Sequence, residues 1–203
     1  MRNIAILASG SGTNAENIIK YFSNAKTANV SLVMSNKRQA MVLKRAEAHG
    51  IRTVFFERNE FYVTGKVLRY LDLYKIDFIV LAGFLWLVPE NILKKYTGRI
   101  INIHPALLPS YGGKGMYGDV VHKAVIDNHE TESGITIHYV NKFYDSGDII
   151  FQVRCKVDPS DTPDSLAQKV HALEYAHYPK VIEDLVVKLP DFSINGPEET
   201  KNN

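Results

Sequence analysis

The sequence predicts an α/β fold in which a mostly parallel, twisted sheet carries helices on both faces. Through the first half of the chain, short β-branched and apolar runs alternate with stretches of helical periodicity, the pattern of parallel strands joined by crossover helices. These runs are almost wholly apolar, as expected for strands covered on both faces. After residue 104, a Pro/Gly-rich loop leads to two strand-like runs joined by a short turn, which predicts antiparallel late strands. The parallel part is therefore Rossmann-like.

The elements follow in a regular order. The first predicted strand covers residues 3–9, and a glycine-rich turn joins it to a helix near 14–24. Strands at 30–35, 53–56, 78–83 and 100–104 alternate with helices at 39–49, 60–74 and 89–96, the last opening at Pro89 as first helical turns favour. A helix near 118–128, strands at 134–140 and 149–157, and a helix over 162–189 with a Thr/Asp-rich start complete the pattern.

Length and composition favour one domain over residues 1–190, with 191–203 as a polar, flexible tail. Of the 203 residues, 45% are hydrophobic and 23% are charged, which is enough apolar material for a sizeable core. The 24 basic and 22 acidic residues give a formal charge of +2, too balanced for a dedicated nucleic-acid binder. We therefore expect no nucleic acid among the partners.

Cysteine usage and hydropathy bear on the compartment. Cys155 is the single cysteine, which excludes an internal disulfide and a cysteine-rich metal cluster and suits a buried thiol in a reducing environment. The longest apolar run, at 78–88, falls well short of the ~20 residues that span a bilayer. The apolar run after Met1 is short and ends in glycines, unlike a secretory signal. We expect a cytoplasmic protein without membrane contact.

The segment LASGSGTNAENII, residues 7–19, joins the first strand to the first helix and suits an anion. Gly10 and Gly12 let the backbone turn tightly, and the amide groups at the helix start can bind a phosphate. Asn14 lies where a short polar side chain can cap the helix or bind the anion directly. Considered alone, the loop fits equally well a glycine turn that only permits close packing of strand and helix.

The same loop matches the dinucleotide pattern G-x-G-x-x-G/A, with Ala15 in the last position. An NAD site requires an acidic residue about 20 positions further on to hold the ribose hydroxyls. Residues 35–38 supply no acid there, although Lys37 and Arg38 could meet a 2′-phosphate. The missing acid counts against NAD.

Asn102 and His104 stand at the end of the predicted strand 100–104. Strand alternation puts them on one face and Ile101 and Ile103 on the other. Ligands of open α/β sheets bind beyond the carboxyl ends of the strands, where this strand ends. An Asn can donate to a developing oxyanion and a His can move protons near pH 7, so the pair suits acyl transfer without a nucleophilic Ser or Cys.

The pair lacks a local carboxylate to orient the imidazole. Asp145, in the turn FYDSGDII between the late strands, is our candidate, and Asp148 competes with it. The alternative is structural, because an Asn-x-His pair can also cap a strand and satisfy buried backbone groups.

These residues lie within a longer set of motifs that resembles the phosphoribosylglycinamide formyltransferases, a family of folate-dependent transformylases. SGSGTN, SNK, LAGF, INIHPALLPSY and FYDSGDII occur here in that family's order, and the resemblance extends from about residue 3 to 187. The NIHPxLLP element is specific to the wider folate formyltransferase group, and the chain length and GSGTN loop select this branch. The resemblance implies the formyltransferase fold and formyl transfer from 10-formyltetrahydrofolate to the amine of glycinamide ribonucleotide in purine (IMP) biosynthesis.

The resemblance also implies the role of individual residues. The catalytic residues of the family fall on Asn102, His104 and Asp145, which would stabilise the tetrahedral intermediate of a direct attack. The implied ribonucleotide-binding residues are Gly12, Thr13, Asn14 and Glu174, and the implied folate-binding residues are Leu85, Trp86, Leu87, Val88 and Asn102. No metal, tightly bound cofactor or covalent enzyme intermediate is expected, and 10-formyltetrahydrofolate serves as cosubstrate.

The chain departs from the family in places. The loop GGKGMYGDVVH is longer and richer in glycine than in some relatives, which leaves the conformation of 111–118 and the role of His122 open. Where some relatives carry an arginine for the folate tail, only Arg58 is near. His138 either lines the cleft or is structural, and Asp148 replaces a familiar proline without an assigned function.

Three other functions compete with this interpretation. Methionyl-tRNA and sugar-nucleotide formyltransferases share the NIHP element but usually carry a further C-terminal domain, for which roughly 15 tail residues leave no room. An NADP-binding oxidoreductase would use the same glycine loop, and a non-catalytic ligand-binding regulator is the third option. We expect small-molecule substrates and a monomer or weak homodimer.

Overall fold

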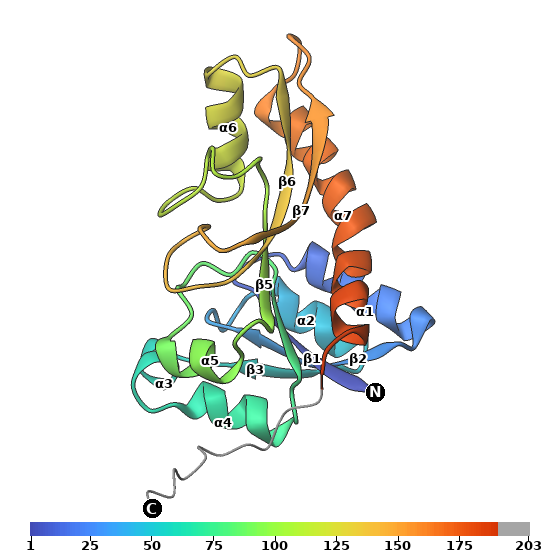
Figure 1. The fold of residues 1–203 in the computed structure, drawn as a ribbon, viewed down its shortest axis with the longest axis vertical. Helices are drawn as coiled ribbons and strands as arrows, with labels where there is room; N and C mark the ends of the chain where they lie inside the picture. The colour runs from blue at the N-terminus through green and yellow to red at the C-terminus, as the bar shows by residue number, and fades with distance from the viewer. Residues whose placement is uncertain (191–203) are drawn as a thin grey trace, which may run out of the picture.

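The computed structural model describes residues 1–190, whose strands form one seven-stranded sheet in the order β3-β2-β1-β4-β5-β6-β7 (Figure 1). The strands are β1 (Arg2–Leu7), β2 (Ala28–Ser35), β3 (Arg52–Phe55), β4 (Phe78–Leu81), β5 (Ile100–His104), β6 (Glu132–Tyr139) and β7 (Ile149–Lys156). The first five are parallel to one another, whereas β6 pairs antiparallel with both β5 and β7. The predicted α/β class and the antiparallel late strands are confirmed.

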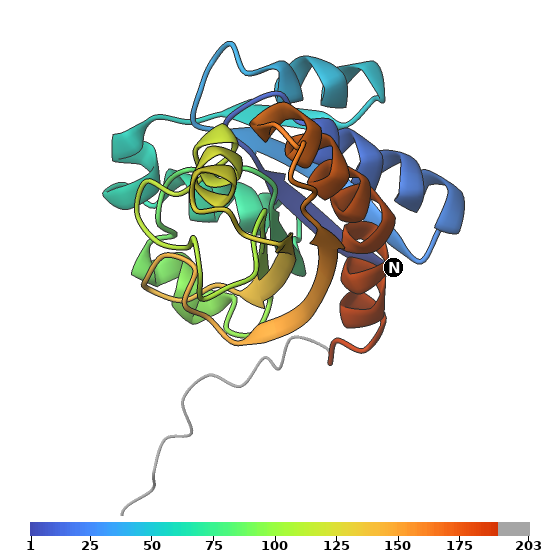
Figure 2. The same ribbon diagram turned by 90° about the horizontal axis from the view of Figure 1, so that it is seen from above.

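Helices cover both faces of the sheet, as expected. One face carries α1 (Thr13–Ala25), α2 (Met41–Ala48), α6 (Asp119–Asp127) and α7 (Pro163–Val187), and the other carries α3 (Arg58–Tyr62), α4 (Lys66–Leu73) and α5 (Glu90–Lys95). Figure 2 shows α1 and α7 side by side over the sheet. The two long helices thus bring residues near position 14 and position 174 into one neighbourhood.

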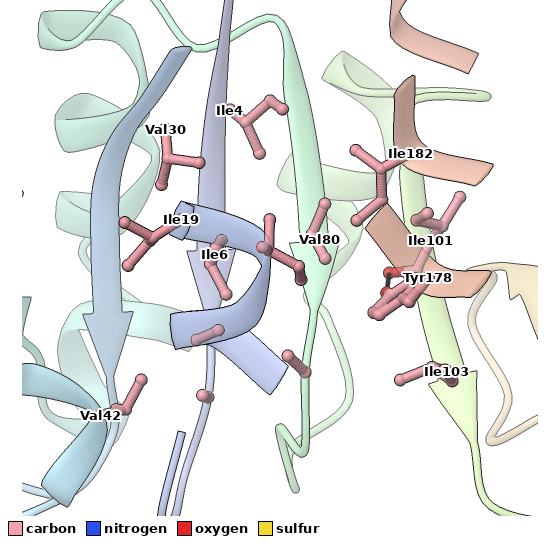
Figure 3. Close-up of a cluster of buried hydrophobic side chains, with 14 of the residues drawn as sticks. Ile4, Ile6, Ile19, Val30, Val42, Val80, Ile101, Ile103, Tyr178 and Ile182 are labelled. Carbon is pink, nitrogen blue, oxygen red and sulfur yellow. Dashed lines mark hydrogen bonds between the residues drawn. The ribbon is translucent and has the colours of Figure 1, made fainter. Parts of the chain in front are cut away.

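Strand alternation distributes the core between these two faces. In β1, Ile4 and Ile6 join the cluster under α1 and α7, whereas Ala5 and Leu7 join the opposite cluster. Figure 3 shows Tyr178 and Ile182 of α7 beside Ile101 and Ile103 of β5 in the first cluster. The Tyr178 hydroxyl also donates to the carbonyl of Leu81 over 2.9 Å. Burying one large apolar side chain completely stabilises the fold by about 1.5–3 kcal/mol, so this packing holds α7 against the sheet.

One predicted helix is wrong in extent. The expected helix at 60–74 is two helices, α3 and α4, separated by residues 63–65. A capping box between Glu57 and Glu60 starts α3, and Gly65 at φ +65° precedes α4 in a left-handed conformation that glycine adopts without strain. The apolar periodicity continues across the break, which explains why the pattern suggested one helix.

Other boundaries agree with the predictions to within a few residues. Cys155 is only half-buried, not buried as expected, because it lies on β7, one of the two edge strands of the sheet. The predicted tail, 191–203, lies outside the described residues. Every helix within residues 1–190 is too short or too polar to cross a membrane.

The sheet order places a ligand site at the carboxyl ends of β1, β4 and β5. From β1 the chain builds outward through β2 to β3, and then returns to place β4 and β5 on the other side of β1. Connections that leave in opposite directions from neighbouring strands open a crevice between them, where ligands of such sheets bind. The glycine loop after β1 and the Asn-x-His pair of β5 both end at this crevice.

Candidate active site

A cavity of about 570 Å³ occupies this crevice, a volume within the range of small-molecule sites. It is enclosed by the glycine loop, the segment after β4, the end of β5, the loop before α6, the β6–β7 turn and the inner side of α7. The residues that line it are Gly10–Asn14, Ala82–Trp86, Asn102–Pro105, Gly113–Gly118, His122, Tyr144, Asp145, His171 and Glu174. All of the residues predicted to bind or to react except Leu87 and Val88 therefore line one cavity.

The predicted catalytic side chains lie together at its floor. Nδ1 of His104 lies 3.6 Å from Oδ2 of Asp145, and Nδ2 of Asn102 lies 3.5 Å from Oδ1 of the same carboxylate. Asp145 has a φ of +49°, a left-handed conformation that costs energy in a non-glycine residue and that clusters at functional sites. Asp148 is exposed, and its backbone carbonyl accepts from the Tyr139 N–H. Asp145, not Asp148, is the partner of His104.

Asn102 is also held from the neighbouring strand. His138 is its direct partner across the β5–β6 ladder, and its Nε2 lies 3.2 Å from Nδ2 of Asn102. Nδ1 of His138 lies 2.8 Å from the carbonyl of Tyr139, which can only accept, so in the neutral ring Nε2 is the acceptor. His138 therefore orients the Asn102 amide, and the sequence left its role open.

The environment of His104 sets its protonation. Its side chain is nearly inaccessible, and burial lowers the pKa of His104 although the Asp145 charge and the Tyr111 carbonyl oppose this. Burial alone raises the pKa of Asp145, but the nearby His138 ring, whose Nε2 lies 3.6 Å from Oδ1, the His104 charge and the Gly113 N–H outweigh it, and the net shift is downward. At pH 7 an ionised carboxylate thus faces a neutral imidazole that can accept a proton.

The glycine loop forms the opposite wall of the cavity. Gly12 has a φ of +77°, and a Cβ atom there would lie 2.4 Å from Cβ of Val42, so only glycine fits. Asn14 does not cap α1; its Nδ2 donates to Oε2 of Glu174 over 2.8 Å, and its Oδ1 is buried and has no hydrogen-bond partner among residues 1–190. An orphaned acceptor at a cavity wall is a place for a ligand donor.

Glu174 is a buried carboxyl group on α7, with only 5% of its surface exposed. Burial raises the pKa of Glu174, and the hydrogen bond from Asn14 only partly offsets this. A carboxylate kept at the wall of a polar cavity at this cost is suited to accept hydrogen bonds from ligand hydroxyl or amine groups.

The segment after β4 forms an aromatic wall. Leu85 and Trp86 line the large cavity, whereas Trp86, Leu87 and Val88 line a smaller adjoining hollow of about 50 Å³. Asn102 and Asp145 line both spaces, so these two residues lie where the cavity and the hollow meet. Arg58 lies over the Trp86 ring, 5.6 Å from its centroid. The predicted folate-binding residues therefore adjoin Asn102 and Asp145.

Two further histidines line the cavity. His122 is buried on α6, and its Nδ1 has no hydrogen-bond partner in the described part of the chain; the centroid of the His171 ring of α7 lies 6.3 Å from that of His122, edge to face. Burial and the nearby His171 lower the pKa of His122. Neither residue has a spacing that signals ligand binding, because they come together only through the packing of α6 on α7.

The alternative dinucleotide site finds little support in this geometry. Among the residues described, Lys37 and Arg38 are not part of the cavity wall, and the Arg38 guanidinium instead lies 4.3 Å from the centroid of the Phe55 ring. Within residues 1–190, the His, Cys, Asp and Glu side chains form no group of three or more arranged to hold a metal ion.

Comparison with known proteins shows to which family the chain belongs. Residues 2–182 match the formyl transferase family model. Phosphoribosylglycinamide formyltransferase of Bacillus subtilis is 36% identical over 92% of this chain and 95% of its own length. The chloroplastic phosphoribosylglycinamide formyltransferase of Arabidopsis thaliana is 37% identical over 89% of this chain, which spans 64% of that protein.

Solved structures agree with the sequence comparison. The crystal structure of phosphoribosylglycinamide formyltransferase from Bacillus halodurans superposes with a TM-score of 0.83 at 34% identity, covering 96% of this chain and all of that one. The enzyme of the same name from Anaplasma phagocytophilum also gives a TM-score of 0.83, at 33% identity over 94% of this chain and 90% of its own. The chain therefore belongs to the formyl transferase family, within its phosphoribosylglycinamide formyltransferase branch.

Proposed function

We propose that this protein transfers the formyl group of 10-formyltetrahydrofolate to the amine of glycinamide ribonucleotide in purine biosynthesis. The observation that carries this is the position of Asn102 and Asp145, which line both the large polar cavity and the small aromatic hollow. A bisubstrate transfer needs its reacting groups at the meeting point of two binding spaces. The family membership and the names of the relatives support the same two substrates.

The ribonucleotide occupies the side of the cavity formed by the glycine loop and α7. Gly12, Thr13 and Asn14 offer the backbone amides of the α1 N-terminus, which suit the phosphate group. Glu174 accepts from the ribose hydroxyls or the glycinamide nitrogen. These contacts direct the substrate amine toward Asn102.

The folate occupies the aromatic side. The flat pterin ring fits against the apolar wall of Leu85, Trp86, Leu87 and Val88, and its formyl-bearing nitrogen points to Asn102. The Arg58 guanidinium beside Trp86 is the nearest candidate cation for the acidic tail of the folate.

The chemistry follows from the protonation states of the floor residues. The substrate amine attacks the formyl carbon, a carbon–nitrogen bond forms, and the carbonyl oxygen becomes an oxyanion. His104 accepts the proton that the new ammonium nitrogen releases, and ionised Asp145 stabilises the resulting imidazolium. The N–H of Asn102 that has only the long 3.5 Å contact to Asp145 donates to the oxyanion. Collapse breaks the bond to the folate nitrogen, which takes the proton from His104.

This sequence of steps refines the prediction for His104. A histidine that is neutral before the reaction becomes the cation that stabilises the oxyanion by taking the proton of the attacking amine. No metal and no covalent enzyme intermediate take part in the proposed route.

An assay with defined substrates tests the proposal. Purified protein is incubated with 10-formyltetrahydrofolate and glycinamide ribonucleotide, and deformylated folate is followed by absorbance while the formylated ribonucleotide is identified by mass spectrometry. Methionyl-tRNA, an amino-sugar nucleotide and NADPH binding are tested in parallel. We expect turnover with glycinamide ribonucleotide alone; turnover with another amine, or NADPH binding without transfer, would overturn the proposal.

A further inference from the structure

The loop after β5 reaches the His104–Asp145 pair through its backbone. The Tyr111 carbonyl accepts from Nε2 of His104 over 2.7 Å, and the Gly113 N–H donates to Oδ2 of Asp145 over 2.9 Å. Between them, a Cβ on Gly112 would lie 2.6 Å from the Leu108 side chain and 3.3 Å from Cβ of Asp145. Residues 111–113, which we call the backbone clamp, are thus in contact with both members of the pair.

The clamp is anchored from outside the cavity. The hydroxyl of Tyr111 donates to Oε1 of Glu130 over 2.7 Å, and Glu130 stands in the turn between α6 and β6. The Tyr111 ring packs against the main core cluster, and its backbone has a φ of +57°, which costs energy in a residue with a side chain. Because neither side chain lines the cavity, the anchor is distinct from the binding residues.

The clamp determines which nitrogen of His104 exchanges a proton. A carbonyl oxygen can only accept, so Nε2 keeps its hydrogen and Nδ1 is the atom that gains or loses one. Nδ1 is also the atom that faces Asp145, 3.6 Å away. If the Tyr111 carbonyl moved away from Nε2, the His104 ring could rotate or change its tautomer.

We propose that Tyr111 and Glu130 are positioning residues for His104, and that their side-chain hydrogen bond holds the clamp carbonyl on Nε2. This proposal rests on the proposed function for its kinetic consequences but not for its effect on the imidazole itself. Neither residue touches substrate, since both act through the backbone of the clamp.

Three variants separate the anchor from the general fold. Tyr111→Phe removes only the hydroxyl and Glu130→Ala only the acceptor, whereas Glu130→Gln retains a carbonyl oxygen that can accept the same hydrogen bond. Glu132→Ala is the matched control, because Glu132 is an exposed carboxylate two positions away whose partner is Arg154 and not Tyr111.

The first readout is the titration of His104 by NMR, which needs no substrate. The charged groups that face His104 are Asp145, His138 and His122, and none of them is changed in these variants. The Tyr111 carbonyl favours the protonated ring, so loosening it lowers the pKa of His104 in Tyr111→Phe and Glu130→Ala. Glu130→Gln and Glu132→Ala should titrate like the wild type.

The second readout is steady-state kinetics. We expect kcat to fall about tenfold in Tyr111→Phe and Glu130→Ala with KM for both substrates within twofold, and the limb of the kcat–pH profile that reports His104 to move to lower pH. An unchanged His104 titration in both variants overturns the proposal, and so does a lower melting temperature with wild-type kcat and pH profile. If the protein transfers no formyl group to glycinamide ribonucleotide, the proposed function fails while the NMR result still decides the positioning role.

Discussion

Asn102 and His138 are direct partners across the β5–β6 ladder, and 3.2 Å separates Nδ2 of the amide from Nε2 of the ring. The contact fixes which end of the amide faces Asp145, because Nδ1 of His138 lies 2.8 Å from the Tyr139 carbonyl and carries the hydrogen of that bond, which leaves Nε2 as the acceptor for the amide nitrogen. An amide held in one orientation loses no rotational freedom when it binds the oxyanion. This cross-strand pair therefore preorganises the proposed reaction centre.

Replacing Asn102 tests the amide as an oxyanion donor. We expect Asn102→Ala to lower kcat by about 10²–10³, the cost of one such donor, with a circular dichroism spectrum like the wild type. Asn102→Asp should be at least as impaired, because its carboxylate would accept where the site needs a donor and would repel Asp145. Substantial turnover by Asn102→Ala in single-turnover assays would remove Asn102 from the proposed mechanism.

Replacing Asp145 tests the charge that opposes the burial of His104. Burial lowers the pKa of His104, and Asp145 is the main group that opposes it, so Asp145→Asn should lower that pKa further. NMR titration of the His104 ring measures the change, and Asp148→Asn, at an exposed carboxylate, is the control with no expected effect. If Asp145→Asn leaves the titration unchanged, Asp145 does not stabilise the imidazolium.

The lowered pKa of His104 also makes the free energy of unfolding depend on pH. Folded His104 binds its proton less tightly than the unfolded side chain, whose pKa is about 6.5. The unfolded state therefore takes up more protons as the pH falls below this value, and the free energy of unfolding decreases until the folded pKa is passed. Chemical denaturation between pH 7.5 and 5 should show a smaller decrease in a His104→Asn variant.

Much of this site follows from local sequence patterns. Strand alternation predicts that Asn102 and His104 share a face, and the apolar runs predict the parallel strands whose ends form the crevice. Asp145 was chosen from its place in the β6–β7 turn, and its left-handed backbone has no signal in the neighbouring residues. Such local patterns extend only a few residues along the chain.

What escaped prediction depends on contacts between distant segments. The hydrogen bond between Asn14 and Glu174 joins residues 160 positions apart. The family resemblance assigns both residues to one substrate, but nothing near either residue indicates that they contact each other. His138 acquires its role from the register of β6 on β5, which a shift of one residue would abolish. The break between α3 and α4 is different, because it has a local cause. Gly65 is unfavourable inside a helix, so the sequence does contain a signal for this break.

Gly12 and Gly10 form a matched pair for the geometry of the glycine loop. A Cβ on Gly12 would lie 2.4 Å from Val42 on α2 and the residue has a φ of +77°, whereas a Cβ on Gly10 meets nothing within 4 Å. Overpacking and left-handed strain together should destabilise Gly12→Ala by about 2–4 kcal/mol, and Gly10→Ala by much less. Urea denaturation compares the two, and equal losses would mean that α2 does not constrain the loop.

Trp86, the single tryptophan of the sequence, provides a direct probe of the folate wall. If the pterin packs against residues 85–88, adding a folate should change the intrinsic fluorescence, and Trp86→Phe should abolish that change. Trp86→Ala should raise KM for 10-formyltetrahydrofolate and leave KM for glycinamide ribonucleotide within twofold. A rise in KM for the ribonucleotide alone would assign this wall to the other substrate.

Glu174 should stabilise the bound substrate at the expense of the folded protein. Burial raises the pKa of Glu174 above its value in the unfolded chain, so the charge destabilises the fold at pH 7 by about 1.4 kcal/mol for each tenfold change in proton affinity. Glu174→Gln removes the charge and keeps an oxygen to accept from Asn14, so it should unfold at higher urea. That gain in stability should be complete above the pKa of Glu174 in the folded protein and vanish below about pH 4.5, where Glu174 is protonated in both the folded and the unfolded wild type.

Glu174→Gln should also weaken substrate binding. Loss of a charged hydrogen bond should raise KM for glycinamide ribonucleotide about ten- to hundredfold, since such bonds contribute about 1.5–3 kcal/mol. A variant that is less stable at pH 7, or that keeps the wild-type KM, would show that Glu174 serves the fold and not the substrate.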